Sequence, residues 1–486
     1  MTSSVNSSSV SRTNPEAKIV GIGVDFGTSN SAAAVFDGDT LRFATLDAGT
    51  DIMPSALYLD RDLQRLTGQA AIDRYVKDNT GRTVELIPEV IGESSVLVGG
   101  APGSSAPPET LTSKIYGQAT TDAGLQGRLF RGTKRLLGDP NVIRLMVFDH
   151  PFRLVALVTP ILVHINQGIK TLPGMSEASR ATIGHPVNFE GRDSHKNKLA
   201  LTRLQEAYKY AGFESQAFYP EPTAAAVSYL HQHPNADFEH LLTLDFGGGT
   251  LDFCVLKRTR DGFEVVTTHG IPLGGDHLDQ QLFRELLFPL LGKGERYLRR
   301  GFDREIDTKF PFEDYEDLII NWAVSYSLNQ NRFTTPVMEC LDTAQGEVRI
   351  KFRRLRELIK QNLSYTVFQI LKDFKAELSY NERATLDIPE LDIEVQMSRA
   401  EFESLIADAL GKVEQAVDDT LSKASLRADD IQIVLGTGGS SLIPAVRKIL
   451  TDRFGDKVRD HDPFSSVAAG LAIADYQLQK GTLAAS

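Results

Sequence analysis

The sequence predicts an α/β protein with two lobes, and three features of the chain support this prediction. Its 486 residues are more than a single hydrophobic core usually holds. Two stretches, one in each half, repeat one pattern: an apolar strand, an aspartate, a glycine turn and a second apolar strand. A third glycine turn lies near the C-terminus. Matching turns spread along one chain indicate two lobes that close on one ligand.

The first glycine turn lies in residues 19–31, IVGIGVDFGTSNS. The predicted strand ends at Asp25, and Gly27, Thr28, Ser29 and Asn30 form the turn. The apolar residues 32–36 continue as a second strand, so the stretch reads as a hairpin.

The second turn lies in residues 241–256, LLTLDFGGGTLDFCVL, where Asp245 precedes three glycines and Thr250. Glycines let backbone N–H groups approach an anion with no Cβ in the way. Mg²⁺ is usually held by one or two carboxylates, water and substrate phosphates. Either hairpin alone could equally be a glycine-rich turn without a ligand. Because the pattern occurs twice, a site that binds phosphate and Mg²⁺ is favoured.

The third turn, GTGGSS at 436–441, follows the apolar run 431–435. A helix is predicted to begin near Pro444, because proline suits the first helical turn. The glycines of this turn, Gly438 and Gly439, would leave room for part of a ligand beside the backbone.

Composition excludes several classes of function. The formal net charge of −12 disfavours binding to nucleic acid or to an anionic membrane. No apolar run approaches the roughly 18 residues of a membrane span. Residues 1–18 lack the basic start and apolar core of a secretory signal, so we expect a disordered tail and a cytoplasmic protein. The two cysteines, Cys254 and Cys340, form neither a disulfide framework nor a zinc motif.

In order and spacing, the first two turns and five further segments resemble the DnaK-type (70 kDa) heat-shock chaperones, a branch of the actin, sugar-kinase and heat-shock ATPase superfamily. The further segments are EPTAAA at 221–226, GGDHLD at 274–279, SRAEFE at 398–403, VLGTGGSSLIP at 434–444, and DP at 462–463 followed by VAAG at 467–470. The resemblance runs from about residue 19 to about residue 474, and among the members of the family the chain resembles a short, one-part, YegD-like chaperone best.

The resemblance implies an actin-like ATPase fold, with two α/β lobes around a central nucleotide cleft and a subsidiary subdomain on each lobe. Lobe I would cover residues 19–240, with its subdomain at about 49–150. Lobe II would cover residues 241–445, with its subdomain at about 276–380. Residues 446–486 would return to lobe I. Because the chain ends soon after residue 470, we expect no peptide-binding domain.

The resemblance also implies ATP and Mg²⁺ as ligands. Asp25 and Asp245 would hold the metal. The implied catalytic residues are Asp25, Asp245, Glu221 and Thr250. Of these, Glu221 would lie near the attacking water. The implied nucleotide-binding residues are Gly27, Thr28, Ser29, Asn30, Gly247, Gly248, Gly249, Thr250, Gly274, Gly275, Asp276, Lys375, Ser379, Gly438, Gly439 and Ser440. Taken alone, Asp276 would suit a place in a first helical turn.

Some positions depart from the family pattern. Ile72 stands where we align a family lysine that positions water and the γ-phosphate, which predicts slow hydrolysis. Lys134 or Arg135, in GTKRLLG at 132–138, could supply the missing charge or could form an exposed basic turn. On the adenosine side, polar family residues are replaced in this chain by Ala376, Leu442 and Phe464.

The expected function is that of a heat-shock-chaperone-like protein with Mg-dependent, slow ATP hydrolysis coupled to lobe closure. Its protein client is unknown, and neither nucleic acid nor a membrane is expected as a partner. Two alternatives stay open. One is a non-catalytic nucleotide sensor or scaffold, and the other is a sugar or small-molecule kinase, which would need an aspartate base in an acceptor pocket.

Overall fold

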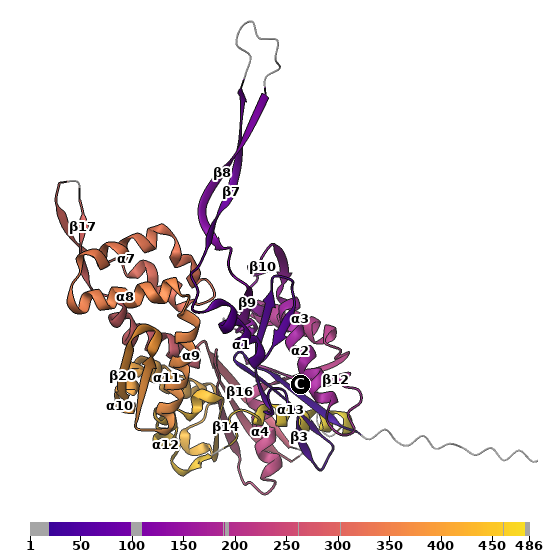
Figure 1. Ribbon diagram of the computed structural model, residues 1–486. Helices are drawn as coiled ribbons and strands as arrows, with labels where there is room; N and C mark the ends of the chain where they lie inside the picture. The colour runs from indigo at the N-terminus through magenta and orange to yellow at the C-terminus, as the bar shows by residue number, and fades with distance from the viewer. Residues whose placement is uncertain are drawn as a thin grey trace, which may run out of the picture.

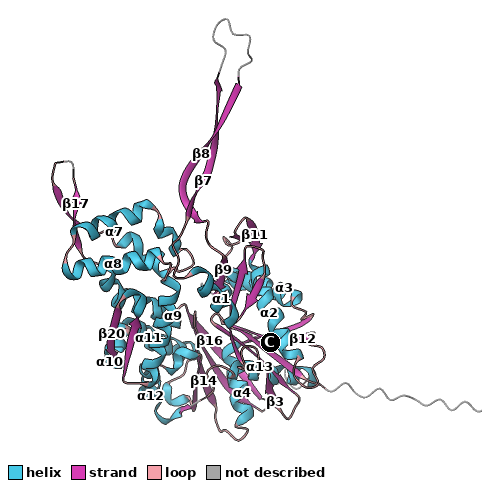
Figure 2. Cartoon of the chain, viewed as in Figure 1, coloured by secondary structure: helices cyan, strands magenta, loops and turns pink. Residues whose placement is uncertain are grey.

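A computed structural model describes residues 19–98, 109–187, 189, 194–260, 262–301, 303–459 and 461–481. The expected tail, 1–18, therefore lies outside the described residues. Two bodies stand side by side, one built mainly from the first half of the chain and one from the second (Figure 1). Each body contains a central sheet with helices packed on it (Figure 2).

The first sheet has six strands in the order β13-β12-β1-β2-β3, with β4 also paired to β2. Its strands are β1 (Gly21–Phe26), β2 (Asn30–Phe36), β3 (Leu41–Phe43), β4 (Ile52–Pro54), β12 (Arg180–His185) and β13 (Ser215–Pro220). Alternate residues of β2 face opposite sides, because Ala33 and Val35 pack in one core cluster and Ala32 and Ala34 in another. The first cluster is covered by α2 (Leu154–Lys170) and α3 (Ser194–Tyr210), and the second by α4 (Glu221–Gln232) and α13 (Ser466–Lys480).

The second sheet repeats this plan in the order β16-β15-β14-β21-β22. Its strands are β14 (His240–Phe246), β15 (Leu251–Thr259), β16 (Gly262–Ile271), β21 (Ile433–Thr437) and β22 (Val458–Arg459). In both sheets the first strand of a hairpin also pairs in parallel with a later strand, β1 with β12 and β14 with β21. The two glycine hairpins therefore occupy equivalent places.

Two helices lie between strands of the second sheet in the chain: α11 (Ala407–Ala424) precedes β21, and α12 (Pro444–Phe454) connects β21 to β22. Of the C-terminal stretch 446–486, α13 returns to the first sheet and contacts β1, β2 and β12. The earlier part of this stretch, which contains most of α12 and β22, stays with the second sheet. There β22 pairs with β21, and α12 contacts α11.

The first body carries an additional group of elements beside its sheet. It contains β5 (Ala56–Asp60), β6 (Arg65–Thr67), α1 (Gln69–Asn79), β9 (Gly127–Arg131), the short 3-10 helix η1 (Thr133–Gly138), β10 (Arg144–Val147) and β11 (His150–Arg153). A long two-stranded hairpin of β7 (Leu86–Val98) and β8 (Glu109–Asp122) projects from this group (Figure 1).

The second body has a larger additional group, which shares one continuous core with the second sheet. Its helices are α5 (Gly275–Leu282), α6 (Glu313–Ile320), α7 (Asn331–Thr343), α8 (Gly346–Lys360), α9 (Ser364–Tyr380) and α10 (Arg399–Leu405), and its strands are β17 (Arg296–Arg300), β18 (Glu305–Lys309), β19 (Arg383–Ile388) and β20 (Ile393–Ser398).

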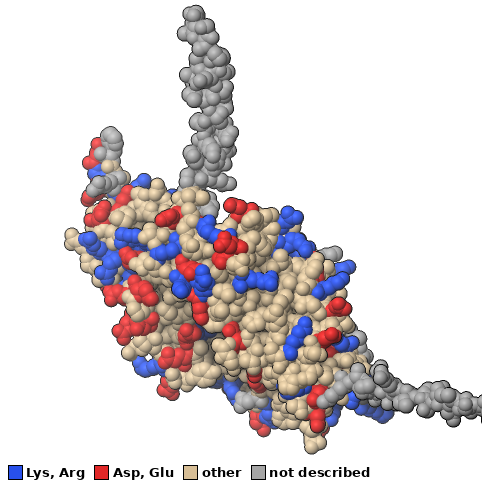
Figure 3. Space-filling model, turned by 45° about the vertical axis from the view of Figure 1, so that its right-hand side comes forward, with Lys and Arg blue, Asp and Glu red and all other residues tan. Residues whose placement is uncertain are grey.

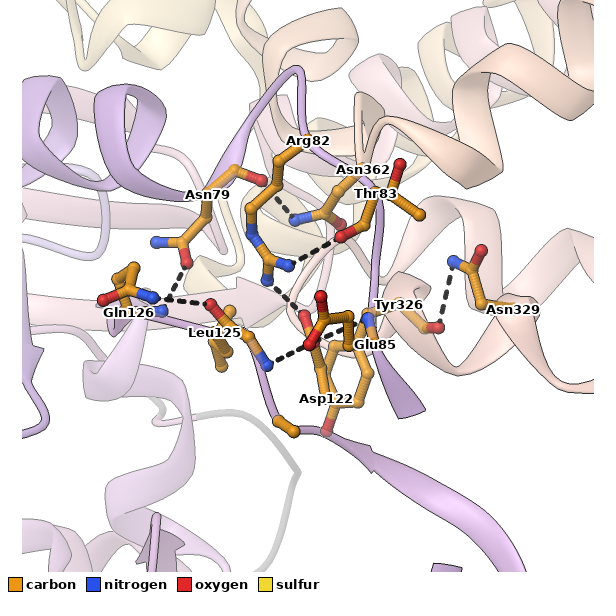
Figure 4. A network of polar contacts seen from close by, with 12 residues as sticks. Asn79, Arg82, Thr83, Glu85, Asp122, Leu125, Gln126, Tyr326, Asn329 and Asn362 are labelled. Atoms are coloured by element: carbon orange, nitrogen blue, oxygen red, sulfur yellow. Dashed lines mark hydrogen bonds and ion pairs between the residues drawn. The ribbon is translucent and has the colours of Figure 1, made fainter. Parts of the chain in front are cut away.

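The two additional groups touch each other at the root of the β7–β8 hairpin (Figure 4). Asn362, between α8 and α9, donates from Nδ2 to the backbone oxygen of Asn79 at 3.1 Å. The carboxamide of Asn79 in turn accepts from the backbone N of Gln126 at 3.0 Å. The ring of Tyr365 also packs against Tyr75 and Trp322, with centroids 5.3 and 4.7 Å apart. The two bodies are thus joined away from their sheets as well.

Among the helices that the structure describes, none combines the length and the apolar character needed to cross a membrane. On the face in Figure 3, basic and acidic side chains are interspersed.

Candidate functional site

A cavity of about 310 Å³ lies between the two bodies. Both glycine hairpins, η1, α4, α5, α9 and the turn after β21 contribute to its lining. Every residue of the predicted catalytic and nucleotide-binding sets lines it except Gly274. The backbone of Gly274 lies directly behind the wall, because a Cβ there would be 2.2 Å from the backbone oxygen of Gly248.

Two aspartates end the equivalent strands and face the cavity, Asp25 on β1 and Asp245 on β14. Burial, followed by repulsion from Glu221, raises the pKa of Asp25 well above its usual range. The same two causes raise the pKa of Asp245 to about 7, although Thr437 Oγ1 donates to its Oδ1 at 3.2 Å. The site therefore holds carboxyl groups close together, and their negative charges oppose one another.

Lys134 brings a cation to this cluster. Its Nζ lies 2.6 Å from Oε1 of Glu221, and the side chains of both residues are less than a tenth exposed. Burial alone would lower the pKa of Lys134, but the carboxylates of Glu221 and Asp25 raise it, so the ammonium stays charged. Glu221 is held in place as the first residue of α4, after Pro220 at the helix N-cap. Lys134 and Glu221 thus form a buried ion pair beside the two aspartates.

Ile72, where we align the family lysine, does not line the cavity. Ile72 lies on α1, is 7% exposed, and packs with Tyr58, Tyr75 and Leu129 in an apolar cluster outside the cavity lining. α1 packs on β5 and β9, and Ile72 is one of its buried residues. The cavity lysine comes from η1, and the exposed-turn interpretation of Lys134 also fails, because this residue is buried.

Arg135, the neighbour of Lys134, reaches across the cavity to the second body. Its Nη2 donates to the backbone oxygen of Gly248 at 2.8 Å and lies 2.5 Å from Oδ2 of Asp276. Lys372 Nζ lies 2.8 Å from the other oxygen of Asp276. Although burial raises the pKa of Asp276, the cations of Lys372 and Arg135 together lower it to about 2. Asp276 is therefore an ion-pair partner across the cavity, in addition to its place in the first turn of α5.

The glycine turns bring backbone into close contact across the cavity. A Cβ on Gly248 would lie 2.3 Å from Ser29 Oγ, so the two hairpins approach each other directly. Gly438 has φ +77°, and a Cβ there would lie 2.8 Å from Asp245 Oδ1. Side chains at these positions would fill the space that a ligand needs.

The family model for "Hsp70 protein" matches residues 194–291 and 307–482, more than half of the chain. The chain belongs to the Hsp70 family. Its relatives include chaperone protein DnaK 3 of Synechococcus sp., 26% identical over 93% of this chain and 57% of the relative. Chaperone protein DnaK of Elusimicrobium minutum is 23% identical and heat shock 70 kDa protein BIP3 of Oryza sativa subsp. japonica 26%, each over 93% of this chain and 56% of the relative.

This Hsp70 chain spans little more than half the length of the relatives it matches. The family membership confirms the expected two-lobed α/β fold of the actin-like ATPases, and the two equivalent sheets agree with it.

The residues of the Hsp70 cavity fit a magnesium ion that arrives with a phosphate ligand. Two half-buried aspartates face a glycine cradle, and their raised pKa values are what a bound divalent cation would relieve. Within the described ranges, no three His, Cys, Asp or Glu side chains are grouped to hold a metal by themselves. A metal with two protein carboxylates that completes its shell from water and phosphate suits Mg²⁺.

The sequence analysis missed Asp252. It pairs with Asp245 in the β14–β15 ladder, and its Oδ2 accepts from Thr250 Oγ1 at 2.9 Å. Burial and the nearby charge of Asp245 raise its pKa well above the usual range. Asp252 thus fixes the orientation of the Thr250 hydroxyl. The signal available in the sequence was an aspartate inside the apolar run of a predicted strand.

Proposed function

We propose that this chain binds Mg-ATP between its lobes and hydrolyses it, and that the nucleotide state controls lobe closure in a chaperone-like protein. The observation that carries the proposal is the Lys134–Glu221 pair, buried beside Asp25 and Asp245 in a cavity whose wall is glycine backbone. A charged lysine held by a carboxylate, next to two carboxylates that suit a metal, matches the needs of phosphoryl transfer to water.

The proposed roles follow from position. Asp25 and Asp245 would hold Mg²⁺, which supplies charge neutralisation to the phosphates when bound. The turn residues 27–30 and 247–250 would hold phosphates through backbone N–H groups and hydroxyls. Glu221 would orient the attacking water, and Lys134 would stabilise the negative charge that develops on the transferred group.

The expectation of slow hydrolysis rested on Ile72, and the buried position of Lys134 removes that reason. We propose instead that Lys134 supplies the cation that was thought to be missing. Lys134 also speaks against a non-catalytic sensor, since that alternative used the same substitution.

Closure is proposed as the output because the lobes already share polar contacts across the cavity. Arg135 spans from η1 to Asp276 and to the turn of Gly248, and Asn362 spans to Asn79. A ligand that adds phosphate contacts to both hairpins would favour the closed arrangement. A protein client and a cytoplasmic location are part of the proposal, and the net charge of −12 disfavours nucleic acid as a partner.

The test is calorimetry of ATP and ADP with and without Mg²⁺, followed by single-turnover hydrolysis. Mg-dependent binding with turnover would support the proposal. Tight binding with no turnover would support a sensor instead, and ADP release that requires a small-molecule acceptor would support a kinase. Absence of any nucleotide binding would refute all three.

A further inference from the structure

Arg135 lies where the two proposed phosphate turns meet. A Cβ on Gly249 would be 3.0 Å from Nε of Arg135 and 3.3 Å from Oγ1 of Thr28, so the guanidinium and both turns converge at this point. The Nη2 of Arg135 also donates to the backbone oxygen of Gly248 at 2.8 Å. Arg135 therefore occupies part of the space in which the turns would hold a phosphate.

Asp276, the partner of Arg135, is fixed to the second lobe through its backbone. The N–H of Asp276 donates to the backbone oxygen of Gly248 at 3.0 Å, and the N–H of Gly275 donates to that of Gly247 at 2.9 Å. The start of α5 is thus tied to the glycine turn itself. Arg135, in contrast, reaches Oδ2 of Asp276 from the other lobe with a long side chain. When this contact breaks, Arg135 is the group that can move away.

Asp276 keeps a second cation when Arg135 leaves. Lys372 Nζ lies 2.8 Å from Oδ1 of Asp276 and 3.8 Å from Oδ2 of Asp279. Asp279 is almost fully buried and is also paired with Lys375, at 2.5 Å. The acids of α5 and the lysines of α9 thus form one chain of ion pairs within the second lobe. Loss of an ion pair is costly mainly when one charge is left alone, so Arg135 can leave at small cost.

We propose that Asp276 is an internal substitute for a ligand phosphate, and that its pair with Arg135 is an autoinhibitory clasp across the empty cavity. This inference rests on the proposed function, because it needs a phosphate ligand at the glycine turns. A guanidinium pairs with a carboxylate and with a phosphate through the same fork of N–H groups, so one anion can replace the other. An incoming phosphate takes over Arg135, and Asp276 stays with Lys372. The clasp therefore competes with the ligand, so it weakens and slows nucleotide binding.

The test is calorimetry and stopped-flow binding in Mg²⁺ buffer, with ATP and with inorganic triphosphate. Asp276→Asn removes the competing charge at nearly constant size, so both ligands should bind about three- to tenfold more tightly and associate faster. Lys372→Met should act in the opposite direction, because Asp276 then depends on Arg135 alone. Asp307→Asn is the matched control, since it breaks an exposed ion pair with Arg296 between β17 and β18 and should have no effect.

A double-variant cycle separates the clasp from simple repulsion between Asp276 and phosphate. Arg135→Met removes the clasp together with one phosphate contact, so it should weaken the binding of both ligands. In that background Asp276→Asn should give no further gain, because the aspartate no longer has Arg135 to hold. A gain of the same size in both backgrounds would show simple charge repulsion and would overturn the inference.

Two other results would overturn the inference. Weaker or unchanged binding of both ligands in Asp276→Asn would show that this acid does not compete with phosphate. Association that is no faster in Asp276→Asn than in the parent would show that the clasp does not control entry. Each of these leaves the proposed function standing, whereas a parent that binds neither Mg-ATP nor triphosphate overturns both.

Discussion

Removal of the Lys134 ammonium is the perturbation that tests the candidate site most directly. Its Nζ lies 2.6 Å from Glu221 Oε1, and both side chains are almost fully buried. Lys134→Ala leaves that carboxylate beside Asp25 and Asp245 without its ion-pair partner. Loss of one partner of a buried pair commonly destabilises a protein by about 3–5 kcal/mol. Proton uptake by the carboxylates offsets part of this loss, so we expect about 3 kcal/mol at pH 8 and less at pH 6.

The effect on turnover should be larger than the effect on binding. Loss of one preorganised charge at a transition state commonly lowers the rate by about 100- to 1,000-fold. The glycine turns and both aspartates remain in Lys134→Ala, so the dissociation constant of Mg-ATP should change by less than about tenfold. Single-turnover hydrolysis at saturating protein measures the first quantity, and calorimetry measures the second.

A double variant separates chemistry from stability. Lys134→Met combined with Glu221→Gln removes both charges and keeps the volumes similar, so the free energy of unfolding should return toward the parent while hydrolysis stays slow. Lys209→Ala, at an exposed position on α3, is the control for lysine removal. Ile72→Lys should lower stability without raising turnover, because it places a charge in an apolar cluster. Turnover within threefold of the parent in Lys134→Ala, or faster turnover in Ile72→Lys, would refute the assignment of Lys134 as the cation that acts in hydrolysis.

Three further predictions follow from the same contacts. Asp245→Asn removes a charge that burial and Glu221 disfavour, so it should raise the melting temperature of the nucleotide-free protein at pH 8. The same variant should abolish the Mg²⁺ dependence of ATP binding. Thermal unfolding and calorimetry measure these two effects, and the exposed control Asp237→Asn should show neither. Burial raises the pKa of Asp245 from 3.8 to about 7, so the folded state holds more protons than the unfolded state between these pH values. The free energy of unfolding should therefore fall as the pH rises from about 5 to 8, while Mg-ATP binding tightens. Urea unfolding and calorimetry at several pH values measure both, and pH profiles that stay the same in Asp245→Asn would contradict Asp245 as the cause. Asn362→Gly keeps the positive φ of 53° but loses the bond to Asn79, so bound nucleotide should dissociate several-fold faster in a stopped-flow chase, and an unchanged rate would show that this contact does not restrain opening.

The sequence by itself located the turns that build the cavity. Glycine positions, the aspartates at the strand ends and the alternation of apolar residues are local features, because each is set by backbone geometry over a few neighbouring residues. Asp25 and Asp245 could be placed in equivalent hairpins for this reason, and both line the cavity. The apolar replacements at Ala376, Leu442 and Phe464 could also be read as belonging to one side of the site, and all three line it.

Only the tertiary structure decided which charges meet. The partner of Glu221 is Lys134, 87 residues earlier in the chain, and no local pattern distinguishes it from a surface lysine. Ile72 is aligned with a family lysine, but α1 packs on β5 and β9, and the Ile72 side chain lies in an apolar cluster. In the same way Asp276, which suits a first helical turn, pairs with Arg135 from the opposite lobe. Ion pairs between distant segments depend on how whole elements pack, and the energy of a charge depends on the burial that this packing creates.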